Sequence, residues 1–208
     1  MTLSIEDVRA AAQRVAGHIR PVALAPVEQG AWGAAEGWLA LEFLQHTGTF
    51  KARGAFNFVR AHQEAGTLPD TGVTIASGGN AGLACAWAAA RHSVPATVFV
   101  PETAPPVKVD RLRRLGAEVH QIGTEYDDAR EAAQKHAAET GALLSHAYDH
   151  PLIAGAAGTV MEEILQARPD LDTVVVAVGA AGCSLVSRYP PWSTGWGSSP
   201  WSRTGAGP

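Results

Sequence analysis

The sequence predicts an α/β protein in which helices cover both faces of a parallel sheet. Short apolar segments typical of strands alternate along the chain with helical patterns of about ten residues. Strands that alternate with helices in this way imply crossover connections, which join parallel strands. The 208 residues are 46% hydrophobic and 17% charged, a composition typical of a globular protein with one substantial core or two small ones.

The chain opens with the pattern of an amphipathic helix. Ser4 and Asp7 form a capping signal, and apolar residues recur at helical spacing from Val8 to Ile19. Further strands are expected over residues 38–43, 73–76, 96–100, 118–122, 142–145 and 173–178. The helices between them are expected over residues 53–65, 81–91, 107–115, 126–139 and 158–167. Sheets of this kind bind ligands at the loops that leave the carboxyl ends of their strands.

Composition and charge exclude several classes of function. The net charge of -4 and the scattered arginines predict no nucleic-acid partner. The two cysteines are too few for a disulfide framework, and no His or Cys spacing predicts a metal site. Charged residues near the N-terminus and the lack of a long apolar run predict neither a signal peptide nor a membrane span. We therefore expect a cytoplasmic protein.

Lys51 is the candidate nucleophile among only three lysines. Lys108 and Lys135 lie in charged helical segments, where a solvated face is the expected role. Lys51 instead follows a predicted strand, within the segment HTGTFKARGAFN, where Gly48 and neighbouring apolar residues give freedom and cover. Burial beside a cation such as Arg53 would lower the pKa of the Lys51 amine and favour its reactive neutral form. A surface lysine at a helix start is the alternative.

Two further loops contain glycines after a strand. Ser77, Gly78, Gly79 and Asn80 lead from an apolar strand into a helix, so their backbone N–H groups can form an anion site. A plain turn with a capping side chain is the alternative. A third loop, with Gly179 and Gly182, follows the strand expected over residues 173–178 and is a weaker candidate for binding a phosphate.

Several motifs in one order resemble a known enzyme family. They are, in sequence, TFKARGAFN, SGGNAG, VPATVFVPETAPPVKVDRLRRLGAEV, YDHPLIAGAAGT and VVVAVG. The series is similar to the threonine and serine dehydratases of the fold-type II pyridoxal-phosphate enzymes and covers residues 1 to about 179. The resemblance implies an α/β fold with two parallel-type, three-layer sheets. It also implies the cofactor pyridoxal 5'-phosphate and a small amino acid as substrate.

The resemblance assigns roles residue by residue. Lys51 would bond covalently to the cofactor and later remove the proton from the substrate's alpha carbon. Phe50 would pack near the cofactor ring, Asn80 would hydrogen-bond the ring hydroxyl oxygen, and Gly179 would lie at the cofactor phosphate. The substrate carboxylate would be held by Ser77 and the N–H groups of Gly78, Gly79, Asn80 and Ala81. Loss of the beta hydroxyl group from L-threonine or L-serine would yield a 2-oxo acid and ammonia.

Two positions depart from the family pattern. Many relatives have a second serine where Gly78 stands, and racemases use it on the opposite face of the substrate, so a two-base racemase is disfavoured. Ala81 stands where histidine is frequent, which favours the serine dehydratase branch. A racemase or a beta-replacement enzyme for hydroxy-amino acids remains an alternative.

The resemblance also predicts the domain organisation. Residues 1–51 and 147–179 would form the N-terminal portion of a large cofactor-binding domain, left incomplete, and residues 52–146 a small α/β domain. Residues 180–208 contain three of the six tryptophans and no Asp, Glu or Lys, and we expect a tail without ordered structure there. A frameshift in the coding DNA near Gly179 is our hypothesis for this change, and it predicts poor solubility and little activity.

Two rival functions come from other classes. One is a catalytically inactive remnant that no longer binds the cofactor. The other is a small-anion binding module that uses only the loop from Ser77 to Asn80. A homodimer is possible for a folded enzyme of this kind.

Overall fold

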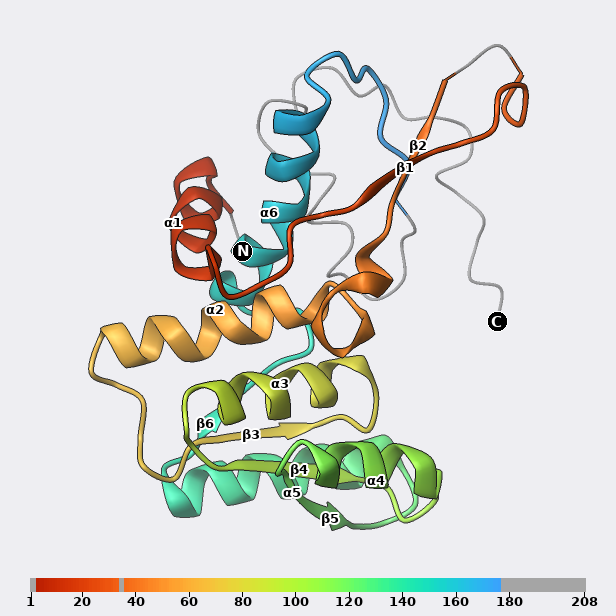
Figure 1. Ribbon diagram of the computed structural model, residues 1–208. Coiled ribbons are helices and arrows are strands. Elements are labelled where there is room, and N and C mark those ends of the chain that lie inside the picture. Colours follow the sequence, from red (N-terminus) through yellow and green to blue (C-terminus); the bar gives the residue numbers. More distant parts are fainter. Residues whose placement is uncertain (1–2, 34–35, 177–208) are drawn as a thin grey trace.

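The computed structural model describes residues 3–33 and 36–176, and it confirms the α/β class (Figure 1). Its centre is a four-stranded parallel sheet in the order β5-β4-β3-β6. The strands are β3 (Val73–Ala76), β4 (Ala96–Val100), β5 (Glu118–Gln121) and β6 (Leu143–Leu144). Every residue of β3 and β4 is buried, as expected for central strands covered on both faces.

Helices cover this sheet on both sides. Helices α3 (Asn80–Arg91) and α4 (Pro106–Arg114) pack on one face, in a core that includes Ile75 and Val98. Helix α5 (Tyr126–Thr140) covers the other face, where Ala129 and Ala133 pack against Phe99. The alanines let helices lie close to the sheet, and the three-layer arrangement follows from the crossover connections.

A second group of helices is stacked on the outer side of α3. Helix α2 (Lys51–Glu64) lies between α3 and α6 (Pro151–Ala167), and α1 (Ile5–Val15) packs on α6 (Figure 1). The predicted cap of α1 is confirmed, because Asp7 N–H donates to Ser4 Oγ while the Asp7 carboxylate accepts from Ser4 N–H. Helix α2 therefore connects the sheet-bearing layers to the α1 and α6 pair.

Three small elements lie between α1 and α2. Strands β1 (Leu24–Pro26) and β2 (Trp38–Ala40) form an antiparallel pair. Two short 3-10 helices, η1 (Glu42–Leu44) and η2 (His46–Gly48), then lead into α2. Within the described residues, the β1–β2 pair and the parallel sheet are the two sheets present. The second parallel-type sheet implied by the resemblance is not seen in this part of the chain.

Three predicted elements differ from the structure by more than two residues at one end. The strand expected over residues 38–43 ends at Ala40, because the chain turns into η1 and brings Glu42 to the buried Arg53. The helix expected over residues 158–167 already begins at Pro151. The described part of the strand expected over residues 173–178 contains no strand, and a strand needs a hydrogen-bonded neighbour to form.

Gly179 and the tail at residues 180–208 lie outside the described residues. No helix in the described part of the chain is long and apolar enough to cross a membrane. The split into residues 1–51 with 147–179 and residues 52–146 remains a prediction. In the structure, α2 makes contacts on both sides of that boundary, with α3 and with α6.

Candidate active site

Lys51 is the first residue of α2, and its side chain extends to the loop after β6. The Lys51 Nζ donates a hydrogen bond to the main-chain oxygen of Ala147 at 2.7 Å. The same nitrogen lies 4.9 Å from the ring centre of Phe50 and 5.2 Å from that of Tyr148. Lys51 is half-buried, so the alternative of a surface lysine does not describe its position.

The topology brings the Lys51 side chain to the ligand-binding edge of the sheet. Ala147 lies in the loop that leaves the carboxyl end of β6, and β6 pairs in parallel with β3. Ser145 N–H extends this pairing with a 2.8 Å bond to Thr74 O. Because β3 leads into the loop from Ser77 to Asn80, both loops leave the same edge of the sheet as neighbours.

The loop from Ser77 to Asn80 ends at the N-terminus of α3. Gly79 is the N-cap residue, and its N–H donates to Ser77 Oγ at 3.3 Å. The helix runs close above this loop, since a Cβ on Gly82 would overlap the carbonyl oxygen of Ser77. The first N–H groups of a helix have no acceptor within the helix, so this end presents donors and a positive partial charge.

The predicted substrate-binding residues are therefore together on one short segment. Ser77, Gly78 and Gly79 are half-buried, Asn80 is exposed, and Ala81 is half-buried in the first turn of α3. A Cβ on Gly78 would lie 3.2 Å from Val100 Cγ1, which shows how closely this loop passes the end of β4. The arrangement suits a small anion, and it leaves little space for a larger side chain at position 78.

The turn before Lys51 has an unusual backbone. Thr47 has φ 62° and ψ 5°, and the next residue, Gly48, has φ 79°. The left-handed region is unfavourable for a β-branched residue, and Thr47 Oγ1 is buried without a hydrogen bond. The two residues reverse the chain so that α2 starts with Lys51 facing the loop after β6.

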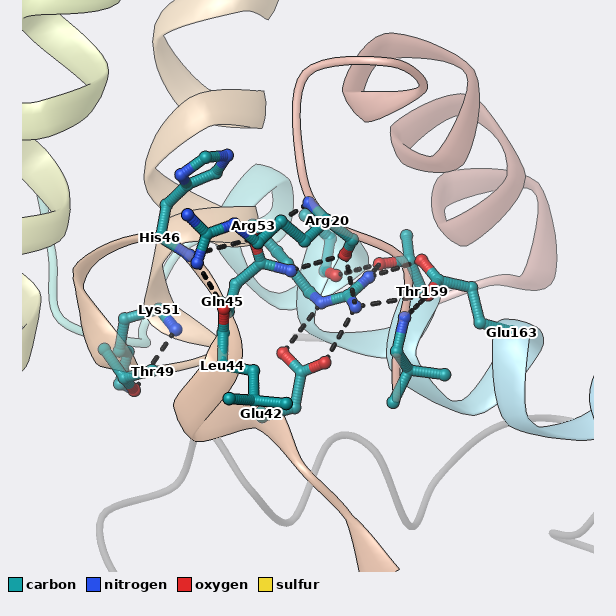
Figure 2. A network of polar contacts seen from close by, with 12 residues as sticks. Arg20, Glu42, Leu44, Gln45, His46, Thr49, Lys51, Arg53, Thr159 and Glu163 are labelled. Carbon is teal, nitrogen blue, oxygen red and sulfur yellow. Dashed lines mark hydrogen bonds and ion pairs between the residues drawn. The ribbon is translucent and has the colours of Figure 1, made fainter. Parts of the chain in front are cut away.

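A buried ionic network lies behind this turn, and the sequence did not reveal it. Arg53 is fully buried between Glu42 and Glu163, and its Nη2 lies 2.8 Å from Glu42 Oε1 (Figure 2). Its Nη1 also donates to Thr159 Oγ1 at 3.1 Å. Two carboxylates and one guanidinium leave this network without excess positive charge, so Arg53 is not simply a cation beside the Lys51 amine, as the sequence suggested. Arg53 instead joins η1, α2 and α6.

Three residues outside the site occupy buried or solvent-facing positions, and the exposure of Lys108 and Lys135 was predicted. Cys85 is buried in α3, and burial raises the pKa of its thiol to about 12, so it behaves as a small apolar side chain. Lys108 is exposed, and the Lys135 side chain is 76% exposed beside Glu139. Among the described residues, no group of three or more His, Cys, Asp or Glu side chains could hold a metal ion.

The residues around Lys51 fit pyridoxal 5'-phosphate in their chemistry. They supply a half-buried primary amine, an aromatic ring beside it and a helix N-terminus at the neighbouring loop. The small cavity between Lys51, Tyr148 and Ile153 measures only about 10 Å³, room for about one water molecule. This cavity is therefore too small for the cofactor ring.

Comparison with known proteins assigns the family. Residues 15–185 match the family model described as pyridoxal-phosphate dependent enzyme. The chain belongs to this family. Members of the family use pyridoxal 5'-phosphate, and they include enzymes that act on amino acids.

The relatives found include lyases and racemases. The chain is 42% identical to an L-threonine ammonia-lyase of Geobacter sulfurreducens over 141 residues, which cover 68% of this chain and 35% of that enzyme. It is 36% identical to an L-threonine ammonia-lyase of Thermotoga maritima over 182 residues, 86% of this chain and 45% of that enzyme. The chain thus spans less than half the length of both lyases.

Solved structures confirm the fold. A pyridoxal 5'-phosphate-dependent aspartate racemase superposes with a TM-score of 0.83 at 30% sequence identity. The match covers 92% of this chain and 61% of the racemase. The arrangement of helices around the parallel sheet is therefore that of fold-type II pyridoxal-phosphate enzymes, as the sequence predicted.

Proposed function

We propose that this protein is a pyridoxal 5'-phosphate-dependent ammonia-lyase that converts L-threonine or L-serine to a 2-oxo acid and ammonia. The observation that carries the proposal is the position of Lys51. Its amine lies at the sheet edge where the loops after β3 and β6 are neighbours, hydrogen-bonded to Ala147 O. The similarity to two L-threonine ammonia-lyases supports the choice of reaction.

Lys51 has two roles in this proposal. Its amine would hold the cofactor covalently, and the freed Lys51 Nζ would take the proton from the substrate's alpha carbon. The cofactor, when bound, withdraws electrons from the alpha carbon, which allows that proton and then the beta hydroxyl group to leave. The carbonyl of Ala147 orients the amine, and the rings of Phe50 and Tyr148 restrict the approach of water.

The loop from Ser77 to Asn80 would position the substrate. Its carboxylate would accept hydrogen bonds from Ser77 Oγ and from N–H groups at the start of α3. Asn80, exposed at the first position of α3, would face the cofactor's ring oxygen. Gly179, which lies outside the described residues, would contact the cofactor phosphate.

A racemase is the second candidate, supported by the similarity to the aspartate racemase structure. A two-base racemase needs a proton donor on the face of the substrate opposite the lysine. Gly78 has no side chain to supply that proton, which favours the lyase. The preference between threonine and serine depends on space for one methyl group, a difference worth about 1–3 kcal/mol.

The experiment uses the full chain, incubated with pyridoxal 5'-phosphate, reduced with borohydride, digested and analysed by mass spectrometry. We expect the pyridoxyl tag on Lys51. Lys108 and Lys135 are exposed and serve as internal controls for non-specific reaction. With one equivalent of cofactor, each should carry much less tag than Lys51, because neither belongs to the proposed site. A chain tagged equally on all three lysines, or on none, would be the inactive remnant and would end the proposal.

Product formation completes the test. With L-threonine, the lyase should release 2-oxo acid and ammonia in equal amounts, and the Lys51→Ala variant should release neither. The Lys108→Ala variant should retain the activity of the unmodified protein. Formation of the D-amino acid without 2-oxo acid would identify the racemase instead.

A further inference from the structure

A second cavity, distinct from the small one beside Lys51, lies next to Arg60 of α2 and Arg91 of α3 and extends to His46 in η2. It measures about 490 Å³ and is lined by His18, His46, Phe56, Arg60, Arg91 and His92, among other residues. Arg60 is more than two helical turns after Lys51 along α2, which places it about 13 Å from the start of the helix. The volume is within the range of roughly 300–1,000 Å³ that is typical of small-molecule sites.

Aromatic packing fixes the walls of this cavity. The His18 ring is stacked on Phe56 with ring centres 4.8 Å apart, and the His92 ring lies 4.7 Å from the same Phe56. His46 is stacked on Trp87 at 4.7 Å. The three imidazoles therefore come from three segments, the start of η2, the loop after α1 and the residue after α3, and each is held against a ring that restricts its motion.

The cavity has an excess of positive groups. Arg60 is paired with Glu64, at 2.9 Å, but Glu64 also pairs with Arg14. Arg91 lies 5.9 Å from the Trp87 ring, and in the described part of the chain it makes no ion pair. Burial, and after it the charges of Arg20 and Arg91, lower the pKa of His46. The charges of the two arginines thus contribute to a positive potential at His46, which lines the cavity.

We propose that this cavity binds a small, multiply charged oxyanion, a phosphate ester or a di- or tricarboxylate, at a site separate from Lys51. Arg60 and Arg91 would supply charge-assisted hydrogen bonds from α2 and α3, and the histidine rings would supply further donors. An anion there would balance charges that have too few carboxylate partners. It would also link α2, through Arg60, to the end of α3, through Arg91.

The competing explanation is that Arg91 only stabilises helix α3. Arg91 is in the last turn of α3, where a cation is favourable to the helix dipole. That role requires no ligand and predicts an effect on stability alone. The two explanations therefore differ in whether Arg91 changes binding.

The test is isothermal titration of the full chain with two probes, inorganic pyrophosphate and citrate. We expect saturable binding of one anion per chain, with an affinity that falls at high salt. Tighter binding of pyrophosphate would indicate a phosphate site, and tighter binding of citrate a carboxylate site. Arg91→Gln and Arg60→Gln should each weaken binding about tenfold or more. Arg91→Lys keeps the positive charge and should retain part of the affinity. Such a difference from Arg91→Gln would show that the lost binding comes from the lost charge and not from a disturbed fold.

Two controls locate the bound anion. Arg113→Gln removes an exposed arginine of α4, 56% exposed, and should leave binding unchanged. The Lys51→Ala variant, and protein whose cofactor has been fixed on Lys51 by borohydride and freed of excess cofactor, should bind the probe as before, because the two sites are separate. Absence of binding, an equal loss in Arg113→Gln, or loss of binding once the cofactor is fixed on Lys51 and its excess removed would overturn the proposal. So would an Arg91→Gln variant that is less stable but binds normally.

Discussion

Lys51 donates a hydrogen bond to the main-chain oxygen of Ala147, 96 positions later in the chain, at 2.7 Å. This contact ties the start of α2 to the loop after β6, so the amine depends on two segments that meet only in the folded protein. The direction of the Lys51 side chain is therefore set by tertiary structure, and substitutions far from residue 51 should affect the site through it.

Arg53→Met tests the buried ionic network. The substitution leaves Glu42 and Glu163 without the guanidinium that separates them, which should lower the free energy of unfolding by about 3–5 kcal/mol. Urea denaturation followed by circular dichroism measures the loss. Arg113→Met, which breaks an exposed pair with Asp110, should cost less than about 1 kcal/mol. Equal effects of the two variants would contradict a structural role for Arg53.

Gly82→Ala tests the close approach of α3 to the loop from Ser77 to Asn80. The added Cβ would overlap the Ser77 carbonyl oxygen, so the loop must move, and we expect a loss of about 2 kcal/mol or more. Gly79→Ala is the matched control, since its Cβ would meet Ser77 Oγ at an ordinary 3.9 Å. Thermal unfolding compares the two. A Gly82→Ala variant as stable as Gly79→Ala would show that the loop yields without cost.

The stability of α6 should depend on pH through His150. The Nδ1 of its ring accepts the N–H of Leu152 at 3.2 Å and caps the helix, which requires that nitrogen to be unprotonated. Burial first, and then the nearby His62 and His146, lower the pKa of His150 below its ordinary value of 6.5. The unfolded chain therefore binds the proton more readily than the folded chain. Stability is fully present above pH 6.5 and falls as the pH drops through the lowered pKa.

His150→Asn separates this effect from other histidines. Asparagine caps a helix with an oxygen that does not titrate, so the variant should lose less stability between about pH 7.5 and about pH 5.5 than the unmodified protein. His46, His62 and His92, whose pKa values are also lowered, remain as a common background. Urea denaturation at the two pH values measures the difference. An unchanged pH dependence would exclude His150 as a contributor.

Cys85 should be inert to thiol reagents in the folded protein. Its side chain is buried in α3, and its pKa of about 12 leaves almost no thiolate at neutral pH. In a Cys183→Ser background, an aromatic disulfide reagent should react slowly in buffer and rapidly in urea. Fast reaction of the folded protein would mean that α3 opens readily at this position.

Much of the central sheet followed from the sequence. Strands β3 and β4 have the predicted bounds, because each is a short apolar run next to turn residues, a local signal. Strand β1 was missed because three residues, one of them proline, show no period. Helix α6 was predicted too short because Gly155 and Gly158 weaken a helical pattern. In the structure these glycines permit close packing, since a Cβ on Gly155 would lie 3.1 Å from Asp7 O.

The sequence identified candidate residues for the site but not the contacts between them. Lys51 and the loop from Ser77 to Asn80 were identified from motifs that are local in sequence. The contact with Ala147 and the pairing of Arg53 with Glu42 and Glu163 were not, because they join segments far apart and no pattern in one sequence pairs them. A lone arginine beside a reactive lysine looks like an electrostatic partner until its burial is known.

The reversed turn at Thr47 and Gly48 sets a limit on how this region can be altered. A threonine at φ 62° costs about 1–2 kcal/mol relative to an ordinary conformation, so neighbouring contacts must hold it there. Replacing Thr47 with glycine would release that cost while loosening the entry into α2. The variant would be more stable to heat, but the Lys51 amine would be held less firmly in its position.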